Sequence, residues 1–264
     1  MTTPELLSDL GAVDGAVDLA PASRAGFLLW DLPLRLFHWL LVAAVTTAIV
    51  TGELGGAWMP WHGRAGLAIV GLLVFRVAWG IVGSATSRFA QFAPSPSSLV
   101  AYLRGSWRGV GHNPLGALSV FALLGLLSLQ AATGLFGNDD IAFAGPLNHL
   151  VGDGAGARAT GWHRVLADGL FVLLALHLLA VAFHVVVKRQ RLLRPMITGR
   201  QELEPGRSVP RPVRGLGHFW LLAAVSLAAV TVLALAAAGG SPVVPVSTAD
   251  AAGHAKPAAS APAW

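Results

Sequence analysis

One apolar segment, residues 161–187, constrains the fold of this chain more than any other, because it carries three histidines. Its length is sufficient to cross a bilayer, which takes about 20 apolar residues in a helix. At roughly 100° per residue, the steps from His163 to His177 and from His177 to His184 each return to within about 40° of the starting direction. The three rings therefore share one face of the predicted helix. Ionisable side chains are costly inside a membrane span and indicate a functional site.

The composition indicates an integral membrane protein. Hydrophobic residues make up 55% of the 264 residues, charged residues make up 12%, and the mean hydropathy is +0.65. The absence of cysteine excludes disulfides, thiolate metal sites, iron–sulfur clusters and covalently attached c-type haem. The net charge of +5 does not predict a nucleic-acid partner, because the basic residues cluster beside apolar segments and act as topology signals.

The hydropathy pattern predicts an all-α integral membrane protein, with a four-helix transmembrane bundle and a fifth, C-terminal transmembrane helix. The main domain covers residues 27–199, and its spans are expected at about residues 34–51, 62–82, 114–136 and 162–187. The connections between spans are expected to be loops, including residues 138–160. The other segments are a disordered tail (1–26), a basic linker (200–217), the fifth helix (218–239) and a second disordered tail (240–264).

The distribution of Lys and Arg predicts the orientation of these spans. Residues 84–113 and 188–217 carry three and eight Lys or Arg residues, whereas residues 52–61 and 138–160 carry none and one. Cytoplasmic connections are enriched in such residues. We therefore expect a cytoplasmic N-terminus and linker, and a periplasmic C-terminal tail.

This topology assigns a depth to four histidines. His62 opens the second span and His163 opens the fourth, so both lie near the outer face, whereas His38 enters the first span from the inner face. His177 lies about 21 Å further inward than His163. Two pairs result, His62–His163 and His38–His177, each on two helices at one depth. Facing helices of bundles commonly hold cofactors, and imidazole is the commonest metal ligand. The pairs predict two b-type haems, each with two axial histidines, which carry electrons rather than bind oxygen.

Three arginines lie near these predicted sites. Arg76 follows His62 by fourteen residues and is expected to face the inner haem, where it either binds a propionate or extends to the inner headgroups. Arg64 and Arg164 follow the two outer ligands and either bind the outer propionates or lie at the membrane interface. Small residues beside the ligands leave room for a flat macrocycle: Gly63, Gly66, Gly161 and Gly169.

The remaining histidines have weaker interpretations. His184 shares the ligand face and is an alternative to His177 as an inner ligand, although it lies about 10 Å beyond it. His112 precedes the third span, where Asn113 is expected to cap the helix and Pro114 to begin it. His112 is interpreted as a headgroup-level residue or as part of a quinone pocket.

Several motifs in order resemble the bacterial di-haem cytochrome b561 superfamily, which includes the membrane b subunits of nickel–iron hydrogenases and formate dehydrogenases. They are RLFHW in the first span, WHGRAG in the second, and GWHRVLADGLFVLLALH in the fourth. GHNPLGALSV and TGLFGNDD look like the subset that pairs with c-type cytochromes. The resemblance covers about residues 27–199. It implies the same two ligand pairs, exchange with the quinone pool, and a redox partner at the bacterial inner membrane.

The leading hypothesis is a cytochrome b that transfers electrons across the inner membrane between the quinone pool and a periplasmic c-type cytochrome. Asp139 and Asp140 would offer such a partner negative charge, or are only solvating charges of the loop. The first alternative is the haem-bearing membrane anchor of a hydrogenase or dehydrogenase complex. The second is a histidine-lined proton or metal transporter, although no internal repeats or broken helices are evident.

Overall fold

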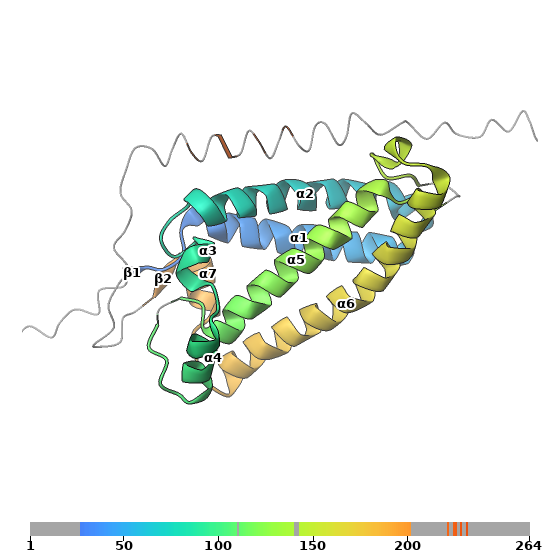
Figure 1. Ribbon diagram of the computed structural model, residues 1–264. Coiled ribbons are helices and arrows are strands. Elements are labelled where there is room, and N and C mark those ends of the chain that lie inside the picture. Colours follow the sequence, from blue (N-terminus) through green and yellow to red (C-terminus); the bar gives the residue numbers. More distant parts are fainter. Residues whose placement is uncertain are drawn as a thin grey trace, which may run out of the picture.

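The computed structural model describes residues 27–201, apart from residue 110 and residues 140–142, together with residues 221, 224, 225, 228 and 231 (Figure 1). The elements are β1 (Phe27–Leu28), α1 (Leu32–Leu54), η1 (Gly56–Trp58), α2 (Met59–Val82), α3 (Phe89–Phe92), α4 (Pro96–Leu103), α5 (Pro114–Phe136), η2 (Asn148–Leu150), α6 (Asp153–Val186), α7 (Leu193–Thr198) and β2 (Arg200–Gln201).

Four helical segments in this described part are long and apolar enough to cross a membrane. They are Leu32–Leu54, Gly56–Val82, Pro114–Phe136 and Asp153–Val186, and they overlap the four spans predicted from the sequence. Many of their apolar side chains face outward, as expected where lipid is the solvent; Val186, for example, is 72% exposed. Apart from the five isolated residues, the predicted fifth helix lies outside the described residues. So do both predicted tails and residues 202–217 of the linker.

The starts of α1 and α5 follow directly from local sequence. The side chain of Asp31 accepts a hydrogen bond from the backbone N–H of Leu34 at 2.8 Å, which caps α1. Asn113 caps α5 in the same way through the N–H of Gly116 at 2.7 Å, and Pro114 occupies the first turn, as predicted. A proline is favourable there because its missing N–H would have no helical partner.

The long helices form two antiparallel pairs, α1 with α2 and α5 with α6, and α2 also packs against α5 (Figure 1). We call the end of the bundle that carries α3, α4, α7 and the β strands the α3 end. The opposite end, which carries η1, η2 and the connection from α5 to α6, is the η2 end. His38 and His177 lie toward the α3 end of their helices, whereas His62 and His163 lie toward the η2 end.

An apolar layer joins all four long helices midway along the bundle. Its buried residues come from each helix in turn: Val45, Ile69, Leu73, Leu127 and Leu170. Because Leu170 lies halfway between His163 and His177 in the sequence, this layer separates the levels of the two histidine pairs. Burial of such side chains excludes water from the region between them.

The chain after α6 returns to the start of α1. Strand β2 pairs with β1 in an antiparallel register, and the carbonyl of Gly199 accepts hydrogen bonds from the N–H groups of Leu29 and Trp30 at 2.8 and 3.2 Å. The indole of Trp39 donates to the carbonyl of Met196 at 3.3 Å, and the guanidinium of Arg35 donates to the carbonyl of Ile197. We call residues 193–201 the strap, because they tie the end of α6 to the start of α1.

The structure differs from the sequence-based prediction at the start of α6. The expected loop over residues 138–160 ends early, because α6 begins at Asp153 and runs for 34 residues. At about 1.5 Å per residue the helix is about 51 Å long, so it extends beyond a hydrocarbon core of about 30 Å. The extra turns are rich in glycine and carry Asp153, Arg158 and Thr160, so the hydropathy pattern does not predict them as part of the span. Their Thr160 hydroxyl donates to the carbonyl of Asn138 at 2.7 Å and anchors the preceding connection.

Candidate functional site

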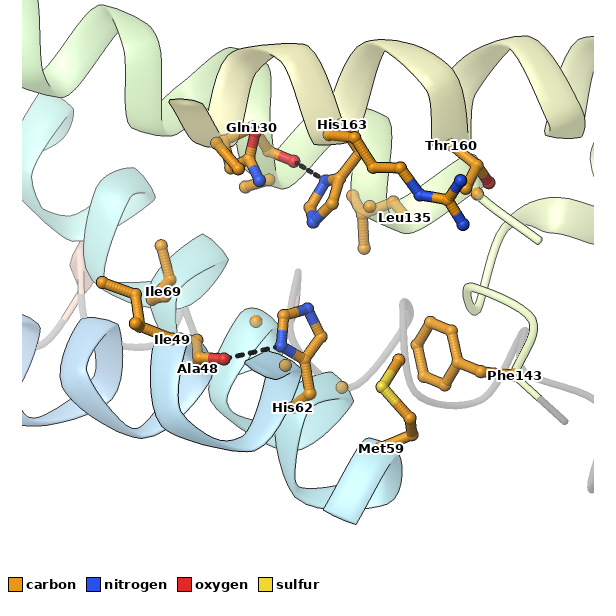
Figure 2. A pocket seen from close by; sticks show the side chains of 18 of the residues that line it. Ala48, Ile49, Met59, His62, Ile69, Gln130, Leu135, Phe143, Thr160 and His163 are labelled. Carbon is orange, nitrogen blue, oxygen red and sulfur yellow. Dashed lines mark hydrogen bonds between the residues drawn. The ribbon is translucent and has the colours of Figure 1, made fainter. Parts of the chain in front are cut away.

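His62 of α2 and His163 of α6 face one another at the η2 end of the bundle (Figure 2). The centroids of the two imidazole rings are 6.0 Å apart, and the ring planes are inclined by 80°. The two residues are far apart in the sequence and belong to different helix pairs. The structure thus brings together the two residues that the sequence assigns to one depth.

The backbone fixes which nitrogen of each ring is free. Nδ1 of His62 lies 2.8 Å from the carbonyl oxygen of Ala48, and Nδ1 of His163 lies 2.9 Å from that of Gln130 (Figure 2). A carbonyl can only accept, so each Nδ1 carries the proton and each Nε2 keeps its lone pair. Thr133 adds a further contact to Nδ1 of His163, at 3.2 Å. Metal-binding histidines in proteins typically use this arrangement.

The separation of the two rings fits a single metal ion between them. Two metal–imidazole bonds of about 2.0 Å in line, plus roughly 1 Å from each nitrogen to its ring centre, place the centroids about 6 Å apart. The measured distance is 6.0 Å. No group of three or more His, Cys, Asp or Glu side chains that could hold a metal ion occurs among the described residues. Two protein ligands are sufficient when a macrocycle supplies the other donors.

Two glycines that the sequence analysis did not single out lie against these rings. A Cβ at Gly52 of α1 would lie 2.9 Å from Nδ1 of His62, and a Cβ at Gly134 of α5 would lie 3.0 Å from Cε1 of His163. A side chain at either position would displace the imidazole. By contrast, a Cβ at Gly66 or Gly161 would have no heavy atom within 4 Å. Gly63 and Gly66, two of the small residues singled out in the sequence, line the space around the rings, and Gly52 and Gly134 add room from the neighbouring helices.

A cavity of about 370 Å³ surrounds the two rings. This volume falls in the range of cofactor and ligand pockets, which is about 300–1,000 Å³. Its walls come from all four long helices and from the α5–α6 connection, which contributes Phe143 (Figure 2). The ring of Phe143 lies edge-on to that of His62 at 6.5 Å and packs against Gly63. We call this cavity, with His62 and His163, the η2-end site.

The second predicted pair, His38 of α1 and His177 of α6, lies toward the α3 end. The two histidines are within range of an electrostatic interaction, although no ring contact between them occurs in the described part of the chain. Nδ1 of His38 is buried and has no hydrogen-bond partner among the described residues. In the described part of the chain, no backbone carbonyl fixes the ring orientation of His38, in contrast to those of His62 and His163. The assignment of this pair as haem ligands stays a prediction.

Arg76 is 2% exposed and lies at the α3 end of α2. Its guanidinium donates to the carbonyl of Ser87 at 3.2 Å and lies 4.3 Å above the ring of Phe89. Nearby, the second carboxylate oxygen of Asp31 accepts hydrogen bonds from the indole of Trp79 and the hydroxyl of Ser87, both at 3.0 Å. The chain itself therefore provides Arg76 with polar and aromatic partners, a possibility that the sequence analysis did not consider.

The two remaining histidines near these sites have distinct environments. Nδ1 of His184 lies 2.8 Å from the side-chain carbonyl of Gln190, so this ring contacts the segment that follows α6. The ring of His112 packs between Trp30 and Phe92, with centroid distances of 4.5 and 4.7 Å. Burial and, to a smaller extent, the positive charge of Arg76 together lower the pKa of His112 to about 4.

A family model described as prokaryotic cytochrome b561 matches residues 29–199, which is more than half of the chain. The chain belongs to the prokaryotic cytochrome b561 family. This b561-type cytochrome is therefore a multi-pass membrane protein that carries haem b and transfers electrons, as the residues of the η2-end site suggest.

Two curated relatives are similar to this cytochrome. A probable Ni/Fe-hydrogenase B-type cytochrome subunit of Azotobacter chroococcum mcd 1 is 23% identical over 209 residues, which cover 65% of this chain and 86% of the relative. A protein with the same description from Rhizobium leguminosarum bv. viciae is 25% identical over 141 residues, which cover 42% of this chain and 59% of the relative. No solved structure matches the chain significantly.

Proposed function

We propose that this b561-type cytochrome binds two haems and transfers electrons across the bacterial inner membrane. The electrons pass between the quinone pool and a redox partner at the periplasmic face, either a c-type cytochrome or a subunit of a redox enzyme. The observation that carries the proposal is the facing pair His62 and His163, with both Nδ1 atoms held by backbone carbonyls and ring centroids 6.0 Å apart. The His38–His177 pair would hold the second haem.

The residues of this chain bind and insulate the cofactor. Haem b supplies a centre that accepts and releases one electron at a time. The carbonyls of Ala48 and Gln130 hold the ligand rings in one orientation, and glycines make room beside the rings. The apolar layer around Leu170 keeps water from the region between the two levels. Because all axial positions would be filled by histidine, the proposed role is electron transfer rather than oxygen chemistry.

The orientation proposed from the basic residues places the η2 end in the periplasm and the N-terminus in the cytoplasm. Arg35, Arg88, Arg104 and Arg108 all belong to the α3 end or to its connections. Accessibility of a single introduced cysteine to a membrane-impermeant reagent tests this orientation. Labelling of Ala57→Cys, but not of Ser106→Cys, in intact spheroplasts is expected, and the opposite pattern would contradict the proposal.

The second candidate is the haem-bearing membrane anchor of a hydrogenase complex, which the descriptions of the two relatives favour. A formate dehydrogenase or related complex belongs to the same class. Purification from native membranes in mild detergent separates these possibilities. A large metalloenzyme that co-elutes with the cytochrome supports the anchor role, whereas a small c-type cytochrome supports the leading proposal. A histidine-lined transporter is less favoured, since His62 and His163 face one another across a cavity and no group of three or more potential metal ligands occurs among the described residues.

The decisive experiment is a reduced-minus-oxidised absorption spectrum of the purified protein with a pyridine haemochrome assay. Two b-type haems per chain are expected, and His163→Ala is expected to lose one of them. His184→Ala is the matched control, because it removes a histidine of the same helix that is hydrogen-bonded to Gln190. A colourless protein after expression with ample haem would contradict the proposal, and two haems in His163→Ala would contradict the assigned ligand.

Arg76 is proposed to contribute a positive charge near the second haem and to bind one of its propionates. Arg76→Leu is then expected to lower the midpoint potential of that haem, because a nearby cation favours the reduced state. Redox titration of both haems checks this expectation. Unchanged midpoint potentials would contradict the propionate contact and would mean that Arg76 has only a structural role, through its contacts with Ser87 and Phe89.

A further inference from the structure

Two arginines follow the two proposed ligands of the η2-end site in the sequence, and the structure separates their environments. Arg64 follows His62 by two residues, and Arg164 follows His163 directly. Arg164 lines the cavity that contains both histidine rings. Arg64 is not among the lining residues of this cavity, and its guanidinium lies 4.8 Å above the ring of Trp61, which is 52% exposed. Similar sequence positions thus correspond to different surroundings.

The charges around the cavity make Arg164 distinctive. Arg164 is the only Lys or Arg in the described lining, whereas Glu53 and Asp139 contribute carboxylates. The carboxylate of Asp139 accepts a hydrogen bond from the N–H of Phe143 at 2.9 Å. No hydrogen bond or ion pair joins the guanidinium of Arg164 to any other residue that the structure describes. Its five N–H donors are therefore available to a bound group.

The group proposed for this cavity is anionic at its edge, because haem b carries two propionate carboxylates. A guanidinium binds a carboxylate through two parallel hydrogen bonds, and this pairing is stronger and more directional than a single neutral hydrogen bond. Glu53 and Asp139 would repel a propionate. Arg164 is the described lining residue whose charge compensates for this repulsion, and its long side chain can extend along the helix toward the η2 end.

We propose that Arg164 is a positioning residue that binds a propionate of the haem held by His62 and His163, and that its charge raises the midpoint potential of this haem. The inference rests on the proposed function. A cation beside the cofactor favours the state with one more electron, and a bidentate contact would help to hold the macrocycle in one orientation. Arg64 has no such role, because its guanidinium packs on Trp61 outside the cavity lining.

The test compares Arg164→Gln with the matched control Arg64→Gln by redox potentiometry and haem quantification of the full chain in detergent. Arg164→Gln is expected to lower the midpoint potential of one haem, or to release that haem, while the other haem titrates as in the wild type. Arg64→Gln is expected to leave both haems unchanged, and Arg164→Lys to restore most of the potential. The titration of His163→Ala, which retains only the other haem, identifies which potential belongs to the η2-end site.

The outcomes distinguish failure of the role proposed for Arg164 from failure of the proposed function. If the wild type binds two haems and Arg164→Gln titrates as the wild type does, the role of Arg164 is wrong and the proposed function stands. Equal shifts in Arg164→Gln and Arg64→Gln also overturn it, because they would indicate a diffuse surface-charge effect. If the wild type binds no haem, the proposed function itself fails. The retained second haem in each variant reports that the bundle has folded.

Discussion

At the scale of single residues, the η2-end site depends on groups that carry no chemistry of their own. The carbonyls of Ala48 and Gln130 are ordinary helix acceptors, yet they select the tautomer of His62 and His163. Gly134 has no side chain, and a Cβ at this position would lie only 3.0 Å from Cε1 of His163. The residues around a ligand thus decide whether the ligand can present its lone pair.

Substitution of Gly134 by Leu is expected to remove one haem per chain, because its Cβ would lie 3.0 Å from Cε1 of His163 and would displace the ring. Gly125→Leu is the matched control on the same helix, since a Cβ at Gly125 has no heavy atom within 4 Å. The haem-to-protein ratio from pyridine haemochrome measures both. Equal haem content in the two variants would show that His163 tolerates the displacement.

At the scale of elements, the strap connects the two helices that carry His38 and His177. The carbonyl of Gly199 accepts hydrogen bonds from both Leu29 and Trp30, directly before α1 begins. Gly199 has a φ of +79°, which favours glycine, and it ends α7. Because α6 packs chiefly against α5, this return of the chain is an additional link between the end of α6 and the start of α1.

Substitution of Gly199 by Ala is expected to lower the thermal unfolding midpoint more than substitution of Gly105 by Ala. Both glycines have positive φ, +79° and +73°, so both variants incur a backbone cost of about 1–2 kcal/mol. Only at Gly199 would the new Cβ also meet the carbonyl oxygen of Trp30, at 2.7 Å. The unfolding midpoints are measured in detergent by circular dichroism. Equal midpoints for the two variants would mean that the strap accommodates the new Cβ with no loss of stability.

At the scale of the whole molecule, the two ends of the bundle differ in character. The η2 end holds the cavity and the facing histidines, whereas the α3 end gathers polar and aromatic contacts around Arg76, Asp31 and His112. The buried ring of His112 packs between Trp30 and Phe92 and couples the start of α1 to the approach to α5. Its ionisation therefore bears on the stability of the entire fold.

Stability is expected to fall as the pH is lowered from about 6.5 toward about 4. The pKa of His112 is lowered from 6.5 to about 4 by burial and by Arg76, so within this range the unfolded chain binds the proton and the folded chain does not. The contribution of neutral His112 to the free energy of unfolding is complete above about pH 6.5 and is lost as the pH falls toward about 4. Unfolding midpoints across this range should show a shallower slope for His112→Phe than for the wild type. His149→Gln, at an exposed position, is the control and should keep the wild-type slope.

Much of the fold follows from local sequence. The four spans are evident because each is a continuous apolar run, and the cap and proline at Asn113 and Pro114 mark a helix start by their own chemistry. The facing of His62 and His163 follows from spacing and topology, because helical periodicity and alternating span direction together fix both face and depth. The early start of α6 does not follow, since its first turns are rich in glycine and its N-cap residue, Gly152, provides no side-chain hydrogen bond that would mark a helix start.

The sequence alone therefore determined the membrane class, the approximate spans and the facing of His62 with His163, because hydropathy and periodicity are properties of short segments. Tertiary structure decided the surroundings of those histidines. Gly52, Gly134 and Phe143 reach the rings from other elements, and Arg164 but not Arg64 lines the cavity. No local pattern encodes such proximity, because it arises only when helices distant in the chain pack together and their side chains compete for the same space.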